Sequence, residues 1–271
     1  MVPILEELTK GKIEKAIREN FEDFYKMAPK NKFKYLEKDG VKWVSSVLPH
    51  PLFNRVVATD CSKEELPNIL NEISQYFQAK KLPFLWMNWT GVDQSDSLIS
   101  FLEENGFWKI IFTIGMALRL EKLRVPQPKV KGLEIVEVKS DKDFAIFMEV
   151  LQSGFEATDE IAQGYQVMNK AILEKPEHGT HYLASYKGKV VAVSSVIYGS
   201  GVAGIYNVST LKRARGKGFG RAVTFVPLLE AKSKGYKLAV LHSSVAGYNV
   251  YKGLGFEEYY EIGLYMRDSE I

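Results

Sequence analysis

The sequence predicts an α/β fold in which one structural unit occurs twice. Both halves of the chain show strand and helix patterns in the same order, and two short motifs recur at one spacing. Val44 to Val47 (VSSV) recurs as Val193 to Val196, and the pair at 106–107 (GF) recurs at 255–256, so each pair is 149 residues apart (193 − 44 and 256 − 107). Such self-similarity indicates a repeated unit. A length of 271 residues is also enough for two domains of ordinary size.

A boundary between the two units is predicted at Lys122 to Lys131 (KLRVPQPKVK). This stretch has two prolines, several cations and no apolar periodicity, which is typical of a linker. We therefore expect an N-terminal domain over residues 1–121, a linker over 122–131 and a C-terminal domain over 132–271.

In the C-terminal half, apolar alternation predicts strands and a 3.6-residue period predicts helices. A strand at 133–138 precedes a helix that starts at Ser140 or Asp141 and a second helix around 161–172. Three strands follow at 180–186, 190–198 and 202–210. The last elements are a helix to about Lys234, a strand at 237–243, a helix at 247–254, and strands on either side of Glu261.

The N-terminal half repeats much of this order. A helix around 13–24 comes first, and two strands at 33–37 and 41–48 flank the Asp39-Gly40 turn. We expect further strands at 52–59 and 84–89, helices at 64–80 and up to Asn105, and a last strand from Phe107.

Composition and charge exclude several classes of protein. With 46% hydrophobic and 25% charged residues the chain is globular, and a net charge of +3 is too small for a typical strongly basic nucleic-acid binder. The single Cys61 and four scattered histidines predict no intramolecular disulfide and no metal site. We expect a cytoplasmic protein without a secretory signal. The uncharged stretch 190–211 alternates and is broken at 199–201, which predicts two strands rather than a membrane span.

One glycine-rich turn suggests chemistry. Gly216, Gly218 and Gly220 lie between the strand that ends at Thr210 and the next helix. Glycines let the backbone approach a ligand, and the first amides of a helix have no partner within it. Such a turn suits a phosphate or diphosphate. The cations Lys212, Arg213, Lys217 and Arg221 add local positive charge.

The C-terminal half resembles the GNAT acyltransferase superfamily over residues 133–267. The resemblance rests on Arg215-x-x-Gly218-x-Gly220 after a strand and on Tyr251-x-x-x-Gly255-Phe256 after the next strand and helix. It implies two GNAT-like units with mixed, largely antiparallel sheets flanked by helices, and a cleft for acetyl-CoA or another acyl-CoA between the fourth and fifth strands. It also implies that the backbone of Val208, Ser209 and Thr210 binds the pantetheine arm. The diphosphate would bind the amides of Arg215, Gly216, Lys217, Gly218, Phe219, Gly220 and Arg221.

Acyl transfer from a thioester to an amine requires an oxyanion donor, a proton source for the thiolate and a neutral amine. Tyr251 is the predicted proton donor, because a phenol is protonated at neutral pH; the alternative is a half-buried aromatic residue. A backbone amide near Val208 or Ser209 is the predicted oxyanion donor. His242 is the candidate base, with a core or rim histidine as the alternative. Glu156 and Glu160 are lower-ranked candidates.

Three residues depart from the family pattern. Ser244 and Gly247 replace an Asn and an Ala that are common before the tyrosine, and Pro227 lies inside the helix after the turn. A proline there removes a backbone hydrogen bond and is expected to kink the helix.

The N-terminal unit lacks the predicted site. At the 149-residue offset, Leu66 to Asn71 correspond to 215–220 and Leu102 corresponds to Tyr251, so the three glycines and the phenol are all missing. We expect a degenerate unit that borders the acceptor groove. Phe84, Trp86 and Trp89 are candidates to line that groove, although aromatic residues in strands are more often core.

The leading hypothesis is therefore an acyl-CoA-dependent N-acetyltransferase with an amine-bearing small molecule or peptide as acceptor. One alternative is a non-catalytic acyl-CoA sensor. Another is an aminoacyl-tRNA-dependent ligase, which the small net charge disfavours.

Overall fold

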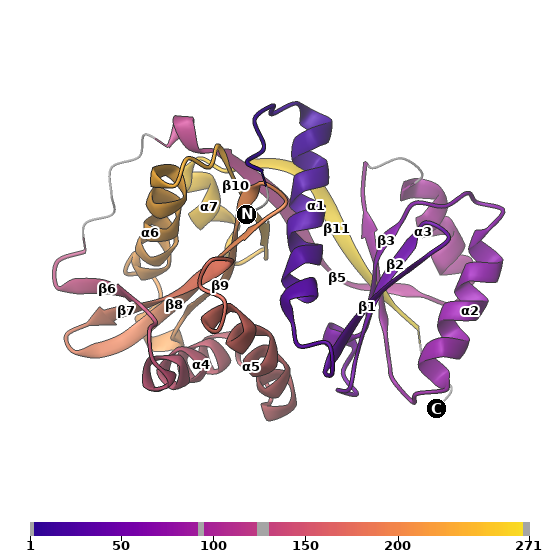
Figure 1. Cartoon of the computed structure of the whole chain (residues 1–271), viewed down its shortest axis with the longest axis horizontal. Helices are drawn as coiled ribbons and strands as arrows, with labels where there is room; N and C mark the ends of the chain where they lie inside the picture. The colour runs from indigo at the N-terminus through magenta and orange to yellow at the C-terminus, as the bar shows by residue number, and fades with distance from the viewer. Residues whose placement is uncertain (1–2, 92–94, 124–129, 268–271) are drawn as a thin grey trace. The chain divides into compact units, whose positions relative to one another are not determined.

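The computed structural model describes residues 3–91, 95–123 and 130–267 (Figure 1). Most of the predicted linker lies outside these residues. By their contacts the residues form two compact units that are not consecutive in the sequence. The first unit comprises Met1–Met27 and Gly115–Tyr259, and the second comprises Ala28–Ile114 and Tyr260–Ile271. Each unit therefore includes a segment from the opposite end of the chain.

The second unit is a sheet with helices packed on it. Strands β1, β2 and β3 are successively antiparallel, β3 and β4 are parallel, and the C-terminal end of β11 is antiparallel to β4. Apolar side chains of the helices α2 and α3 share one core with the sheet. The elements are β1 (Phe33–Lys38), β2 (Val41–Ser46), η1 (Pro51–Phe53), β3 (Arg55–Thr59), α2 (Leu66–Gln78), β4 (Leu85–Trp89) and α3 (Ser95–Glu104).

The first unit contains the sheet order β6-β7-β8-β9-β10. Neighbouring strands are antiparallel except β9 and β10, which are parallel. This unit is mixed and largely antiparallel, as predicted. Its elements are α1 (Lys10–Met27), η2 (Leu120–Lys122), β6 (Leu133–Glu137), α4 (Asp141–Phe155), α5 (Asp159–Leu173), β7 (Gly179–Tyr186), β8 (Lys189–Gly199), β9 (Val202–Thr210), η3 (Lys212–Ala214), α6 (Phe219–Ser233), β10 (Leu238–Ser243) and α7 (Tyr248–Leu254).

Two long strands contribute residues to both units. They are β5 (Trp108–Arg119) and β11 (Glu257–Met266), and each crosses a unit boundary within its length. The strands expected on either side of Glu261 are thus one continuous strand. The order β1-β2-β3-α2-β4-α3-β5 recurs as β7-β8-β9-α6-β10-α7-β11, which agrees with the predicted duplication.

Helices cover both faces of the first unit's sheet. Helices α1 and α4 contact β8 and β9, and α5 packs on β7 beside them. Helix α6 contacts β7, β8 and β9 and packs on α7 (Figure 1). Two consecutive serines of β8 show that α5 and α6 lie on opposite faces. The Ser194 hydroxyl donates to Val223 O of α6. The Ser195 hydroxyl accepts from Asn207, which also donates to Asn169 of α5.

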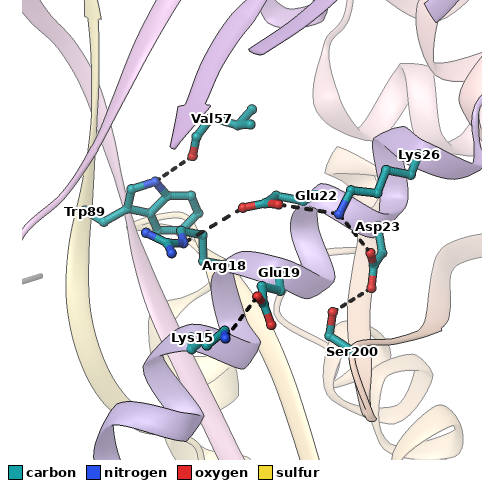
Figure 2. A network of polar contacts seen from close by, with 9 residues as sticks. All are labelled: Lys15, Arg18, Glu19, Glu22, Asp23, Lys26, Val57, Trp89 and Ser200. Atoms are coloured by element: carbon teal, nitrogen blue, oxygen red, sulfur yellow. Dashed lines mark hydrogen bonds and ion pairs between the residues drawn. The ribbon is translucent and has the colours of Figure 1, made fainter. Parts of the chain in front are cut away.

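Helix α1 is fixed to this sheet by buried polar contacts. The Asn20 side-chain amide donates to the carbonyls of Ile197 (3.3 Å) and Gly199 (3.0 Å), and its Oδ1 accepts from the Tyr206 hydroxyl (2.9 Å). Figure 2 shows a second contact, in which the Ser200 hydroxyl donates to Asp23 (2.6 Å). The N-terminal helix therefore belongs to the unit built mainly from the C-terminal half.

Ion pairs run along the same helix (Figure 2). The buried carboxylate of Glu22 lies 3.9 Å from Arg18 Nε and 3.5 Å from Lys26 Nζ, each one helical turn away. Pairs at this spacing stabilise a helix, and the two cations offset the cost of burying the carboxylate.

Pro227 lies within α6, which continues from Phe219 to Ser233. A proline cannot donate to the carbonyl four residues earlier, here that of Val223. The Ser194 hydroxyl of β8 donates to this carbonyl at 2.7 Å. The sheet thus supplies the hydrogen bond that Pro227 removes.

The uncharged stretch 190–211 forms β8, the Gly199–Gly201 turn and β9, as predicted. Among the helices in the described ranges, none combines the length and apolar character needed to cross a bilayer.

Candidate active site

Strands β9 and β10 separate along part of their length in the first unit's sheet. Within the described residues they pair only where Ala203 meets Ala239 and Gly204 meets Val240. Beyond Gly204, β9 continues to Thr210, and along this stretch β8 is its one strand partner within residues 3–91, 95–123 and 130–267. On its β10 side, the main chain of Val208, Ser209 and Thr210 therefore has no paired strand among the described residues, and we call this unpaired edge of β9 the opening. It lies between β9 and β10, where a cleft was predicted.

The glycine-rich turn follows β9 and the short helix η3. Gly216 (φ +77°) and Gly218 (φ +79°) adopt a left-handed backbone conformation, which would be strained in a residue with a side chain. A Cβ would meet nothing within 4 Å at Gly216 and only Val130 at 3.7 Å at Gly218. Gly216, Lys217 and Gly218 are exposed, so the turn is open to solvent.

The amides of this turn are available to a ligand. Within the described part of the chain, the N–H groups of residues 216–221 have no protein acceptor, and no side chain caps α6. The first helical amide that is bonded is that of Ala222, to Gly218 O at 3.0 Å. The Arg215 amide is an exception among the predicted set, because it donates to Lys212 O at 3.4 Å. Six consecutive amides can therefore bind an anion.

The two arginines of the motif bond to protein carbonyls. Arg215 donates to Gly154 O (2.7 Å) and Thr210 O (3.2 Å), which joins the end of α4 to the end of β9. Arg221 donates to Gly253 O (3.1 Å), which joins α6 to α7. Both side chains therefore position the turn.

Glu156 lies next to the turn. It ends α4 in a left-handed conformation (φ +54°), and its carboxylate is 3.8 Å from Lys212 Nζ and 4.0 Å from Arg215 Nη1. Helix α4 approaches β9 closely here, because a Cβ on Gly154 would overlap Ser209 Oγ. Glu160 lies exposed in the first turn of α5.

Tyr251 is buried in α7 and packs edge-on against Phe256, with ring centroids 6.0 Å apart. Burial raises the pKa of its hydroxyl above the ordinary value, so the phenol is protonated at neutral pH. The hydroxyl has no hydrogen-bond partner within the described ranges. Gly247 now has a packing reason: a Cβ there would lie 2.8 Å from the Tyr251 ring.

His242 lies half-buried on β10. Its ring packs against Phe21 of α1, with centroids 4.8 Å apart, and edge-on to Tyr206 of β9 at 6.4 Å. The side chain therefore lies on the sheet face that α1 covers, beside the strand that borders the opening.

Sequence analysis did not single out Asn207. This residue precedes Val208 and has a left-handed backbone (φ +54°) within a strand. Around it β9 has two residues opposite one residue of β8, since Val193 pairs with Ser209 and Ser195 pairs with Tyr206. That arrangement is a β-bulge. The only available signal was the residue type, because Asn tolerates this conformation better than most residues.

In the second unit, α2 begins at Leu66 without glycines. Trp86 (0% exposed) and Trp89 (4% exposed) are buried, and their indole N–H groups donate to Thr59 Oγ1 (3.0 Å) and Val57 O (2.8 Å; Figure 2). Their burial supports a core role rather than the lining of a groove. No group of three potential metal ligands occurs in the part of the chain that is described.

The comparisons with known proteins agree with this geometry. Residues 144–256 match the model of the acetyltransferase (GNAT) family. No curated protein matches the sequence significantly. A GCN5-related N-acetyltransferase from Kribbella flavida superposes with a TM-score of 0.73 at 17% identity, over 95% of this chain and 96% of that chain.

Two further solved structures share the fold. A tandem GNAT protein from the clavulanic acid biosynthesis pathway has a TM-score of 0.64 at 14% identity, over 97% of this chain and 96% of that one. A GCN5-related N-acetyltransferase from Sphaerobacter thermophilus has a TM-score of 0.62 at 15% identity, over 85% and 81%. These likenesses establish a fold that extends over both halves of the chain.

Proposed function

Because residues 144–256 of this chain form an acetyltransferase domain of the GNAT family, we propose that the protein transfers the acetyl group of acetyl-CoA to a primary amine of a small molecule or peptide. The observation that carries the proposal is the row of six amides at the open start of α6, which have no acceptor among the residues that the structure describes. A diphosphate fits such a row, because the N–H groups converge on it and the helix dipole favours negative charge. The exposed Lys212, Arg213 and Lys217 add positive charge around it.

The position of the turn supports a route for the rest of the coenzyme. Strand β9 leads through the short helix η3 into the turn, and beyond Gly204 its edge is not paired with β10 in the described residues. A ligand with its diphosphate at the turn can therefore extend along Thr210, Ser209 and Val208. Their main-chain groups can then bond the amides of the pantetheine arm, which brings the thioester near the bulge at Asn207.

Transfer proceeds by direct attack of the neutral amine on the thioester carbonyl. The tetrahedral intermediate carries an oxyanion, which a backbone amide near Val208 or Ser209 stabilises. Collapse of the intermediate forms the amide bond and breaks the C–S bond, and Tyr251 donates its proton to the departing thiolate. Burial keeps Tyr251 protonated. The hydrogen bond from Arg221 to Gly253 O connects the start of α6 to α7, the helix that carries Tyr251.

Calorimetric titration of the protein with acetyl-CoA tests the proposal. Saturable binding is expected, and Gly218→Phe should abolish it, because the side chain enters the open turn and the left-handed backbone resists it. Gly188→Phe is a matched control. Gly188 is also exposed and left-handed (φ +73°) with open space around it, but it lies in the β7–β8 turn. No binding by the wild-type protein at millimolar acetyl-CoA would refute the proposal.

Catalysis is tested separately by the release of free CoA thiol in the presence of a panel of primary amines. Turnover with at least one amine, together with mass-spectrometric detection of its acetyl product, is expected. Saturable binding of acetyl-CoA with neither amine turnover nor slow hydrolysis of the thioester would instead support an acyl-CoA sensor.

We assign the role of base to His242, which borders the opening on the α1 side. A neutral imidazole can take the amine proton in the physiological range. Replacement His242→Gln should remove the acidic limb of the pH profile of kcat. An unchanged profile would leave proton removal to water.

A further inference from the structure

A buried polar network lies under the bulge of β9. Asn207 donates through Nδ2 to Asn169 Oδ1 (2.6 Å) and to Ser195 Oγ (2.9 Å). The ring of His181 contacts Ser195 Oγ through Nδ1 (2.7 Å) and the Asn169 carbonyl through Nε2 (2.9 Å). Asn169, His181 and Ser195 are each at most 1% exposed. The network thus connects α5, β7, β8 and β9.

The acceptors determine the direction of every bond. The Asn169 carbonyl can only accept, so His181 carries its proton on Nε2 and its Nδ1 is an acceptor. Ser195 must then donate its hydroxyl proton to Nδ1, which leaves its oxygen to accept from Asn207. Asn169 Nδ2 donates to Tyr165 O at 2.8 Å. All these bonds are compatible at once, so the network holds Asn207 in one orientation.

We propose that Asn207 is a positioning residue, and that Asn169, Ser195 and His181 hold its backbone in the left-handed conformation that directs the main chain of Val208 to Thr210 into the opening beside β10. The inference rests on the proposed function. A regular strand places successive peptide groups alternately on its two edges, and the extra residue of a bulge changes which groups point to which edge. The bulge occurs where the thioester would lie. Its geometry therefore decides which N–H group meets the oxyanion.

The chemistry of the clamp explains why the residue is an asparagine. A non-glycine residue in a left-handed conformation is strained, and Asn is among the side chains that tolerate it best. Its amide also supplies two donors to two buried acceptors, Asn169 Oδ1 and Ser195 Oγ. Burial keeps His181 neutral, because it lowers the pKa of the imidazole to about 4. The clamp is therefore constant across the physiological pH range.

The experiment compares acetyl-CoA affinity, measured by calorimetry, in Asn207→Gly, Asn207→Ala and Ser195→Ala. Glycine adopts the left-handed backbone freely, so Asn207→Gly should bind within about threefold of wild type, whereas Asn207→Ala should bind about tenfold more weakly. Ser195→Ala removes one acceptor of the clamp and should also weaken binding. In acetyl transfer assays, kcat should fall in the same order. The backbone carbon chemical shifts of residue 207 should leave the left-handed range only in the weakened variants.

Ser194→Ala is a matched control. Ser194 is the neighbour of Ser195 on β8 and is equally buried, but its hydroxyl bonds to Val223 O on the opposite sheet face. The Ser194→Ala protein should lose thermal stability, as the Ser195→Ala protein does, but it should bind acetyl-CoA with wild-type affinity.

Equal affinity in wild type, Asn207→Ala and Ser195→Ala would overturn the inference and leave the acetyl-CoA function intact. Equal weakening of Asn207→Gly and Asn207→Ala would overturn it too, because the side chain would then act on the ligand itself. Failure of the wild-type protein to bind acetyl-CoA would refute both proposals.

Discussion

The free energy of unfolding should decrease as the pH is lowered, because His181 is buried as a neutral imidazole. This side chain is 1% exposed, and burial lowers its pKa from 6.5 to about 4. In the unfolded chain the imidazole titrates near 6.5, so below that pH the unfolded state binds a proton that the folded state resists. The stabilisation is complete above pH 6.5 and is lost as the pH falls toward 4.

The size of the effect follows from the pKa difference. At 1.36 kcal/mol for each pKa unit, the free energy of unfolding should drop by about 2 kcal/mol between pH 8 and pH 5 and by about 3 kcal/mol at pH 4 from this residue alone. Other groups titrate in the same range, so the informative quantity is the difference in slope between wild type and His181→Gln. His178 is only partly buried, with a side chain that is 44% exposed, and it supplies the control variant His178→Gln.

The assay is urea unfolding at pH 8, 6, 5 and 4.5, followed by far-ultraviolet circular dichroism. All four tryptophans (Trp43, Trp86, Trp89 and Trp108) belong to the second unit, so their fluorescence serves as an internal reference for the unit that lacks His181. The His181→Gln protein should be less stable at pH 8 but should lose less stability on acidification than wild type. Parallel pH dependences of wild type and His181→Gln, within about 0.5 kcal/mol, would refute the buried neutral imidazole.

Three further predictions concern single side chains. Tyr251→Phe should lower kcat at least about tenfold while KM for acetyl-CoA changes little, because only the proton donor is lost; steady-state kinetics with an unchanged kcat would remove its acid role. Gly247→Ala should also lower kcat, because the added Cβ would lie 2.8 Å from the Tyr251 ring, whereas Gly253→Ala on the same helix, with open space around it, should behave as wild type in the same assay. Asn20→Ala should destabilise the first unit by about 2–4 kcal/mol in urea unfolding, since it leaves buried partners on β8 and β9 unsatisfied; a loss under about 0.5 kcal/mol would contradict that role.

Local signals account for what the sequence predicted well. Alternation and helical periodicity depend on a few neighbouring residues, so most elements of both halves were expected near their observed positions. The glycine turn was found for the same reason, because closely spaced glycines indicate a turn, and glycine permits the left-handed backbone that Gly216 and Gly218 adopt. The resemblance that supplied Tyr251 also rests on short motifs whose spacing is visible in one dimension.

Tertiary contacts decided the rest. Helix α1 and the end of β11 each belong to the unit built mainly from the opposite half of the chain, and no local pattern reports such an exchange. Side chains that look suited to a phosphate, such as Arg215, bond to carbonyls of distant residues instead.

By itself, therefore, the sequence determined the elements, the repeat and the glycine-rich turn, because these depend on short motifs that can be recognised along the chain. Only the tertiary structure decided which amides stay unbonded, where β9 leaves β10, and that Asn207 is held by His181, Ser195 and Asn169. The physical reason is that hydrogen bonds between distant residues form only once the chain has packed, and a buried donor or acceptor must find its partner there.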